Sequence, residues 1–367
     1  MDEGKNKWLP TWSLIGPIAS AVFLLSFYVS SDAAASTFWQ AAAVALLGIS
    51  VFSAVHHAEV LAMRVGEPFG SLVLAIAITI IEVGLIVSFT FTDAPGSEFV
   101  ARDTIYSTVM IVLNGVVGLC LITGGRRHYE QVFRRRGVSS ALAILGTLTI
   151  FTLIFPNYTS AAEGPYYSAK QLLFIAVVVL LLYLVFVFVQ TVSHRDYFLE
   201  VSEGERSDGP VRALPNNRTV LGSSALLAVS LLAVVFLAKS LSSAIGSVLV
   251  ALGLPMSFLG VTIAIIVLMP ETVASLRAAL ANKLQISLNL ALGSAIATIG
   301  LTVPIVSIIL LFNGRNMPLG VDPQNLVLLL STLFISTLTL STGRTTVLHG
   351  AVHLVIFSVF IFISAFP

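Results

Sequence analysis

Two glutamates lie deep inside apolar stretches of this chain, at matching positions of two similar segments. Residues 69–82 (FGSLVLAIAITIIE) and 258–271 (FLGVTIAIIVLMPE) each run thirteen residues from a phenylalanine to a glutamate. A carboxylate in hydrocarbon costs about 3 kcal/mol on insertion scales, so such a residue typically marks an ion or proton pathway. We therefore predict that Glu82 and Glu271 form an ion-binding site.

Further oxygen atoms accompany the two glutamates. Thr79 and Thr262 carry hydroxyl groups, and Pro270 directly precedes Glu271. A proline inside a helix lacks the amide proton and crowds the carbonyl four residues earlier, here that of Ile266. A carbonyl freed in this way can line a cavity and coordinate a cation, although a simple kink is the alternative. We expect Thr79, Thr262 and the backbone at Pro270 to belong to the site.

The elements that must position these residues are membrane-spanning helices. Apolar residues make up 57% of the chain and charged residues 10%, and mean hydropathy is +0.98, which excludes an ordinary soluble domain. Repeated apolar runs are long enough to cross a hydrocarbon core of about 30 Å. They predict an all-α polytopic protein of about eleven spans, at 12–30, 37–63, 69–91, 103–123, 139–156, 169–192, 222–251, 255–276, 285–312, 323–341 and 346–366. The seventh contains Lys239, and we expect it to be tilted or broken midway.

The distribution of lysine and arginine sets the orientation, because these residues concentrate in cytoplasmic loops. An inside N-terminus and an outside C-terminus leave only Arg102, Lys170 and Arg315 in outer loops. The cytoplasmic segments and adjoining span ends then hold Lys5, Lys7, Arg64, Arg126, Arg127, Arg134, Arg135, Arg136, Arg195, Arg206, Arg212, Arg218, Arg277, Lys283 and Arg344. The basic loop around Arg134 follows from this rule and from attraction to lipid headgroups, so we expect no nucleic-acid partner.

Five spans separate the two glutamate segments, so the copies enter the membrane from opposite sides. Such inverted repeats place transported ions near the middle of the membrane. We predict a leading helix in residues 1–35, a first repeat in 36–192, a cytoplasmic linker in 193–218 and a second repeat in 219–367. Two alternatives remain open: residues 1–35 as a signal peptide cleaved near Ala33–Ala34–Ala35, and the linker as a cation sensor rather than a solvated loop.

The sequence resembles the ChaA-type cation/proton antiporters of the calcium/cation antiporter superfamily. The resemblance rests on three blocks: His56-His57-Ala58-Glu59 through Gly66-Glu67-Pro68-Phe69-Gly70 to Glu82; Met269-Pro270-Glu271 with Asn289-Leu290, Gly293-Ser294 and Thr302-Val303-Pro304; and Ser341-Thr342-Gly343-Arg344-Thr345 with Leu348 to Gly350.

The resemblance implies a secondary transporter of the bacterial cytoplasmic membrane, with one leading helix and two inverted five-helix repeats. It also implies that Glu82 and Glu271 bind the exchanged cation or protons. Calcium/proton exchangers of the superfamily commonly carry asparagines where this chain has Thr79 and Leu268. Ca²⁺ prefers six to eight oxygen ligands, so Ca²⁺, Na⁺ and K⁺ all remain candidates. No other cofactor is expected.

These residues suggest a mechanism of exchange. Two carboxylates close together in a low-dielectric region do not both stay ionised without a cation. Protons and the cation therefore compete for the pair, and rocking of the repeats exposes it to each side in turn.

Other polar residues within the spans are weaker candidates for the ion pathway. His56 and Glu59 share a helix face, and with His57 they form either a cytoplasmic vestibule or pH sensor, or a structural pair. Lys239 either pairs with a carboxylate or reaches the membrane surface. Ser294 belongs to the second block. His349 stands where many superfamily members have an acid, so it is either a titratable pathway residue or a structural one.

Two other classes of protein are less consistent with the sequence. An intramembrane enzyme would need a catalytic constellation, and His56-His57-Ala58-Glu59 does not match the zinc-binding pattern His-Glu-x-x-His. A cation channel could use the same glutamates, but channels usually line a pore with repeated subunits or carbonyl rings. Coupled exchange distinguishes an antiporter from a channel.

Overall fold

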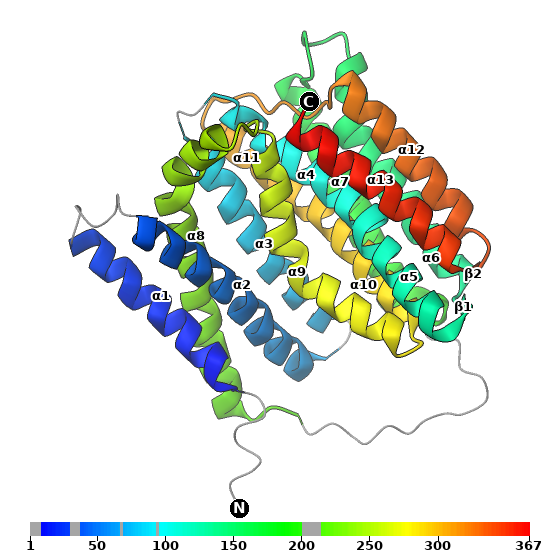
Figure 1. The fold of residues 1–367 in the computed structure, drawn as a ribbon, viewed down its shortest axis with the longest axis horizontal. Coiled ribbons are helices and arrows are strands. Elements are labelled where there is room, and N and C mark those ends of the chain that lie inside the picture. Colours follow the sequence, from blue (N-terminus) through cyan, green and yellow to red (C-terminus); the bar gives the residue numbers. More distant parts are fainter. Residues whose placement is uncertain (1–8, 30–36, 67–68, 93–94, 200–213) are drawn as a thin grey trace, which may run out of the picture. The chain divides into compact units, whose positions relative to one another are not determined.

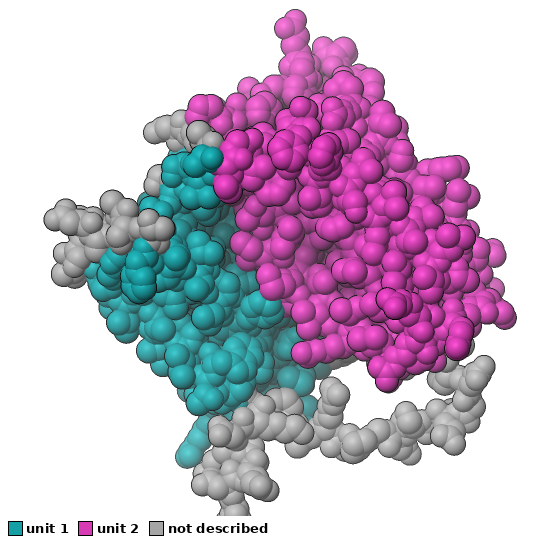
Figure 2. Space-filling view, viewed as in Figure 1, with its two compact units in different colours: residues 1–94, 206–251 teal, residues 95–205, 252–367 magenta. Residues whose placement is uncertain are grey.

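The chain folds into long helices, seen in a computed structural model that describes residues 9–29, 37–66, 69–92, 95–199 and 214–367 (Figure 1). The chain divides into two compact units, coloured separately in Figure 2. Unit 1 comprises residues 1–94 and 206–251, and unit 2 comprises residues 95–205 and 252–367.

The described residues of unit 1 form four helices: α1 (Thr11–Val29), α2 (Thr37–Val65), α3 (Phe69–Thr90) and α8 (Asn217–Ala251). Small residues let their backbones approach closely, as in other membrane helix contacts. A Cβ atom added to Gly70 would lie 2.5 Å from the Ala62 carbonyl oxygen, and one added to Gly84 would lie 2.6 Å from the Val235 side chain. Both α2 and α8 therefore pack tightly against α3, which carries Glu82.

Unit 2 holds seven segments of membrane-spanning length among its described residues. Several combine α-helix with short π- or 3₁₀-helical turns. The elements are η2 (Ser97–Phe99), α4 (Val100–Met110), η3 (Ile111–Val116), α5 (Val117–His128), β1 (Gln131–Val132), α6 (Arg135–Thr149), η4 (Ile150–Ile154), η5 (Phe155–Tyr158), α7 (Ala169–Phe188), η6 (Val189–Ser193), η7 (Arg195–Tyr197), α9 (Phe258–Leu280), α10 (Leu284–Ala297), η8 (Thr298–Thr302), α11 (Val303–Phe312), α12 (Pro323–Leu340), β2 (Arg344–Thr345) and α13 (Val347–Ala365).

The loops of unit 2 gather at two ends, which we name the β end and the loop end. At the β end, β1 and β2 pair antiparallel, and the Gln131 side chain donates to the Ala279 carbonyl oxygen, 2.9 Å away. At the loop end, the Val321 amide donates to the Leu153 carbonyl oxygen at 2.9 Å. The connections between successive spans thus alternate between the β end and the loop end. We expect this arrangement if spans 4, 5, 6, 8, 9, 10 and 11 each cross the membrane.

The predicted all-α, multi-pass architecture is confirmed. Ten segments of the described chain are long and apolar enough to span a bilayer, and α1 contributes a shorter apolar segment, Thr11–Ser26. The seventh predicted span differs in detail, because α8 runs for 35 residues without a break. At 1.5 Å per residue it is about 50 Å long, well beyond a hydrocarbon core of about 30 Å. A helix of this length fits the tilted alternative, and the predicted break midway is not seen.

Some sequence predictions concern residues outside the described ranges. They include the cleavage site at Ala33–Ala34–Ala35 and residues 200–213 of the predicted linker. Glu67 and Pro68 of the first motif also lie outside the described residues. Helix α1 itself is described, and its Ser20 hydroxyl lies 2.8 Å from that of Ser50 on α2.

Candidate functional site

Glu82 occupies a buried position in the middle of α3. Its side chain is 1% exposed, and Thr79, one turn earlier on the same face, is 3% exposed. The Thr79 hydroxyl donates to the Ala75 carbonyl oxygen at 2.8 Å, so its oxygen keeps lone pairs for another partner. Unit 1 therefore contains a buried carboxylate and a hydroxyl oxygen close together on one face of a largely apolar helix.

Glu271 lies in α9, directly after the proline that interrupts the hydrogen-bond pattern of this helix. The side chain of Glu271 is half-buried. Upstream, the Thr262 hydroxyl donates to the Phe258 carbonyl oxygen at 3.1 Å. Pro270 offers no amide proton to the Ile266 carbonyl, and no side-chain donor to this carbonyl is found among the described residues. The second predicted site thus combines a carboxylate with a weakened helix.

The two glutamates have the same place in their helices. Helix α3 begins at Phe69, and α9 begins at Phe258, so each glutamate follows thirteen residues after the first residue of its helix. This corresponds to about 20 Å along the axis. Glu82 belongs to unit 1 and Glu271 to unit 2, and the pairing of the two carboxylates stays a prediction. Within the described residues, no cluster of three or more His, Cys, Asp or Glu side chains could hold a metal ion.

Helix α9 is tethered at the β end of unit 2. The Gln131 amide donates both to the Ala279 carbonyl and to Asn282 Oδ1, at 2.9 and 3.0 Å. Gln285, the second residue of α10, donates to Asn289 Oδ1 at 2.8 Å, and Asn289 donates to the Phe198 carbonyl at 2.6 Å. Asn289 of the second motif therefore holds α10 in place, while Ser294 lies half-buried five residues further along this helix.

The histidine motif of α2 has a structural explanation for one of its residues. His57 is fully buried, and its Nε2 atom lies 3.0 Å from the Ser13 carbonyl oxygen. Pro17 of α1 is four residues after Ser13 and offers that carbonyl no amide proton. The Ser53 hydroxyl donates to the same oxygen at 2.8 Å. His57 therefore links α2 to α1 through a hydrogen bond to the Ser13 carbonyl, which receives no helical hydrogen bond from Pro17.

The remaining pathway candidates of unit 1 are more accessible. Glu59 is exposed and His56 is half-buried, with the His56 ring 5.2 Å from that of Trp12. Lys239 is also exposed, and no ion pair joins it to a carboxylate in the described part of the chain. Both alternatives for Lys239 stay predictions. The vestibule or sensing roles of His56 and Glu59 stay predictions.

A buried polar network in unit 2 was not anticipated from the sequence. Asn114, in the π-helical turn η3, donates to the Thr332 hydroxyl at 2.9 Å, and its Oδ1 lies 3.2 Å from His353 Nδ1. His353 Nε2 lies 2.8 Å from the Thr339 hydroxyl. The network joins η3 to α12 and α13. An asparagine in the middle of an apolar span was the available signal. His349 lies one turn before His353 and is half-buried, so its role as a pathway residue stays a prediction.

Comparison with known proteins identifies the family to which this chain belongs. The family described as "Sodium/calcium exchanger protein" matches residues 35–192 and 222–366. The chain belongs to the sodium/calcium exchanger protein family. The resemblance to cation antiporters of this superfamily is therefore confirmed.

Relatives within this family match nearly the whole chain. The y4hA protein of Sinorhizobium fredii is 49% identical over 363 residues, covering 99% of this chain and 98% of that protein. The sodium-potassium/proton antiporter ChaA of Escherichia coli is 36% identical over 321 residues, covering 87% of each chain. The crystal structure of the Ca²⁺/H⁺ antiporter protein YfkE has a TM-score of 0.69 at 17% identity, covering 97% of this chain and 98% of that chain. The last comparison shows a shared fold.

Proposed function

We propose that this protein is a secondary antiporter that exchanges an inorganic cation for protons across a bacterial cytoplasmic membrane. The observation that carries the proposal is the equivalent position of Glu82 and Glu271 in two helices of a chain that belongs to the sodium/calcium exchanger family. The proton-coupled antiport named for the Escherichia coli relative supports the same function.

The mechanism rests on competition at the two carboxylates. Glu82 is almost completely buried, and an ionised carboxylate in such a place needs a countercharge. A bound cation supplies that charge, and a proton removes the need for it. Thr79 and the Ile266 carbonyl add neutral oxygens that a partly dehydrated cation requires. Alternating exposure of the pair then exchanges cation for protons.

Three observations support the inverted repeats. The two stretches matched by the family, 35–192 and 222–366, have nearly the bounds of the predicted repeats, 36–192 and 219–367. Each glutamate helix starts at the equivalent phenylalanine. In addition, spans 4 and 9 occupy equivalent places in the two repeats, and each has a π-helical turn midway, at Ile111–Val116 and Thr298–Thr302. Such turns are frequent at functional sites.

The proposed cation is Ca²⁺, with Na⁺ or K⁺ as the alternative. Two carboxylates with several neutral oxygens suit Ca²⁺, and YfkE is described as a Ca²⁺/H⁺ antiporter. The monovalent alternative is favoured by Thr79 and Leu268, which offer no amide oxygen. It is also favoured by the relative named as a sodium-potassium/proton antiporter. The orientation proposed from the arginine and lysine distribution places the β end of unit 2 in the cytoplasm.

Reconstitution in liposomes tests the proposal. Purified protein is placed in liposomes with an acidic lumen, and lumenal pH is followed after Ca²⁺, Na⁺ or K⁺ is added outside. We expect at least one cation to dissipate the gradient in the wild type. Glu82→Gln and Glu271→Gln should each abolish this response, because each removes a charge that the cation and the proton share.

Glu163→Gln provides the matched control, since Glu163 is exposed in a loop of unit 2. It should exchange at the wild-type rate. Wild-type exchange by either purified glutamine variant at position 82 or 271 would remove that residue from the site. Cation flux without movement of protons would instead support a channel.

A further inference from the structure

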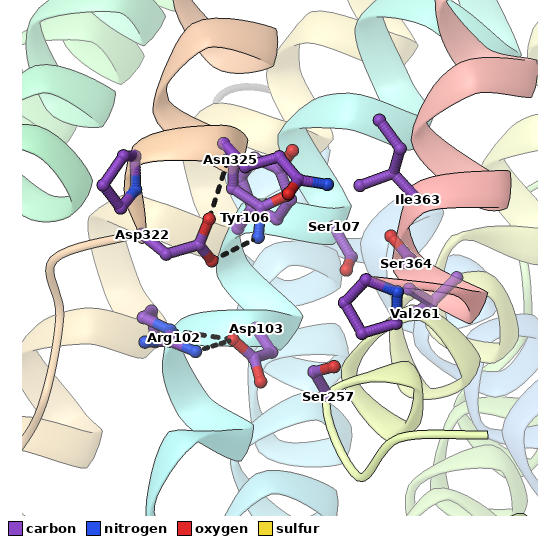
Figure 3. A pocket seen from close by; sticks show the side chains of 13 residues that line it. Arg102, Asp103, Tyr106, Ser107, Ser257, Val261, Asp322, Asn325, Ile363 and Ser364 are labelled. Atoms are coloured by element: carbon purple, nitrogen blue, oxygen red, sulfur yellow. Dashed lines mark hydrogen bonds and ion pairs between the residues drawn. The ribbon is translucent and has the colours of Figure 1, made fainter. Parts of the chain in front are cut away.

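A polar cavity lies at the loop end of unit 2, separate from the predicted glutamate site (Figure 3). Its volume is about 500 Å³, and its walls come from the starts of α4, α9 and α12 and from the end of α13. Val261 of α9 lines this cavity, and Glu271 lies ten residues further along the same helix, about 15 Å away. The proposed exchange does not account for this cavity.

Oxygen atoms dominate the polar lining of the cavity. Two carboxylates, Asp103 and Asp322, line it together with the hydroxyl groups of Tyr106, Ser107 and Ser257. Asp103 is 7% exposed. Figure 3 shows these side chains arriving from different elements around a common space. Carboxylate and hydroxyl oxygens are ligands that suit alkali and alkaline-earth cations.

Two of the oxygens lack the hydrogen-bond partners that buried polar atoms normally have. Tyr106 is 4% exposed, yet its hydroxyl has no hydrogen-bond partner in the described structure. Asn325 Oδ1 is buried and equally without a partner. Leaving such atoms unsatisfied costs about 1–3 kcal/mol each. Both side chains line the same cavity, which indicates that a ligand or ordered water completes their bonding.

The charged groups of the cavity leave a net negative charge. Arg102 binds Asp103 through Nη2 and Nε, at 2.7 and 2.8 Å from Oδ1, and this pair is neutral. Asp322 is the remaining carboxylate. Its oxygens accept from the Asn325 amide and side chain at 2.9 and 2.6 Å, which are neutral donors. The charged side chains that line the cavity therefore sum to one negative charge.

The walls of the cavity are held rigidly by neighbouring segments. A Cβ atom on Gly260 would lie 2.5 Å from the Asp103 carbonyl carbon, so the backbones of α4 and α9 are in close contact. Asn157 donates to the Val321 carbonyl at 2.6 Å and fixes the chain just before Asp322. The oxygens are thus pre-positioned, which lowers the entropic cost of binding a ligand.

We propose that this cavity is a second cation-binding site, which takes an inorganic cation that keeps part of its water shell. The net negative charge attracts the cation, and Asp103 Oδ2, Asp322, Tyr106 Oη and Asn325 Oδ1 provide its oxygen ligands. The cavity volume of about 500 Å³ leaves room for water molecules beside an ion, since one water occupies about 30 Å³. In the proposed orientation the site faces the outside of the cell.

Binding is tested in the purified Glu82→Gln/Glu271→Gln protein, so that the predicted exchange site does not contribute. Na⁺, K⁺ and Ca²⁺ chlorides are titrated by calorimetry, with choline chloride maintaining ionic strength. We expect this protein to bind one of these cations. Adding Tyr106→Phe should weaken binding about tenfold, because one oxygen ligand is lost. The cation should also perturb the tyrosine absorbance, and Tyr106→Phe should remove that perturbation.

Tyr106→Phe is suited to this test because its hydroxyl makes no hydrogen bond within the described structure and its ring contact with Phe360, 5.6 Å between centroids, is retained. Glu98→Gln is the matched control, since Glu98 is exposed just before α4 and does not line the cavity. Equal affinities in the Tyr106→Phe and Glu98→Gln proteins would overturn the proposal. Absence of cation binding to the double glutamine variant would also overturn it, while leaving exchange by the wild type untouched.

Discussion

The contact between α4 and α9 makes a quantitative prediction about stability. A Cβ atom on Gly260 would lie 2.5 Å from the Asp103 carbonyl carbon and 2.7 Å from the Thr104 nitrogen. Carbon atoms in favourable contact are about 3.5–4.0 Å apart, so Gly260→Ala must separate the two backbones by roughly 1 Å. Overpacking of this kind costs about 1–3 kcal/mol, and the helix preference of alanine returns about 1 kcal/mol.

With an overpacking cost of about 3 kcal/mol and a gain of about 1 kcal/mol from helix preference, we expect Gly260→Ala to lower the free energy of unfolding by about 2 kcal/mol. Gly146→Ala is the control, because Gly146 of α6 has nothing within 4 Å of its added Cβ atom. That variant should be about 1 kcal/mol more stable than the wild type. Equilibrium unfolding of the purified proteins in mixed micelles measures both values. If the two variants are equally stable, the close approach of α4 and α9 is refuted.

Two further predictions concern buried hydrogen bonds. His57→Ala should lower the free energy of unfolding by about 1–3 kcal/mol, because the Ser13 carbonyl loses a hydrogen-bond donor. The pH profile of exchange should keep its shape in this variant. A shifted profile would instead support pH sensing by His57. Asn114→Leu leaves the Thr332 hydroxyl and His353 Nδ1 without their shared partner, and should lower the free energy of unfolding by at least about 1–3 kcal/mol. An unchanged denaturation midpoint in this variant would show that the network contributes no stability.

Much of the fold could be predicted from the sequence because a membrane helix must satisfy its own backbone within one apolar run. The predicted third span, 69–91, corresponds to α3 at Phe69–Thr90, and the predicted tenth, 323–341, to α12 at Pro323–Leu340. The fourth span was predicted to begin at residue 103, whereas the helical segment begins at Ser97. A charged residue such as Arg102 typically ends an apolar run, but here Arg102 forms an ion pair with Asp103 at 2.7 Å within the helical segment.

The candidate sites were only partly accessible to sequence reasoning. Glu82 and Glu271 stand out because a charge in a run of Ile, Leu and Val is expensive. His57 stood out for the same reason, although its partner, the Ser13 carbonyl, depends on Pro17 in another helix. Such partners lie far apart in the chain and follow only from tertiary packing. The same holds for Tyr106, an ordinary membrane residue until its hydroxyl is seen beside a cavity.

Proton release on cation binding tests the central claim most directly. A cation is added to purified protein in a lightly buffered solution, and the pH change is calibrated against the amount of cation bound. Competition for the glutamate pair predicts that the wild type releases at least one proton for each cation it binds beyond those bound by the Glu82→Gln/Glu271→Gln protein, and that the double variant releases none. Cation binding to the wild type without proton release, or equal release by both proteins, would contradict the account.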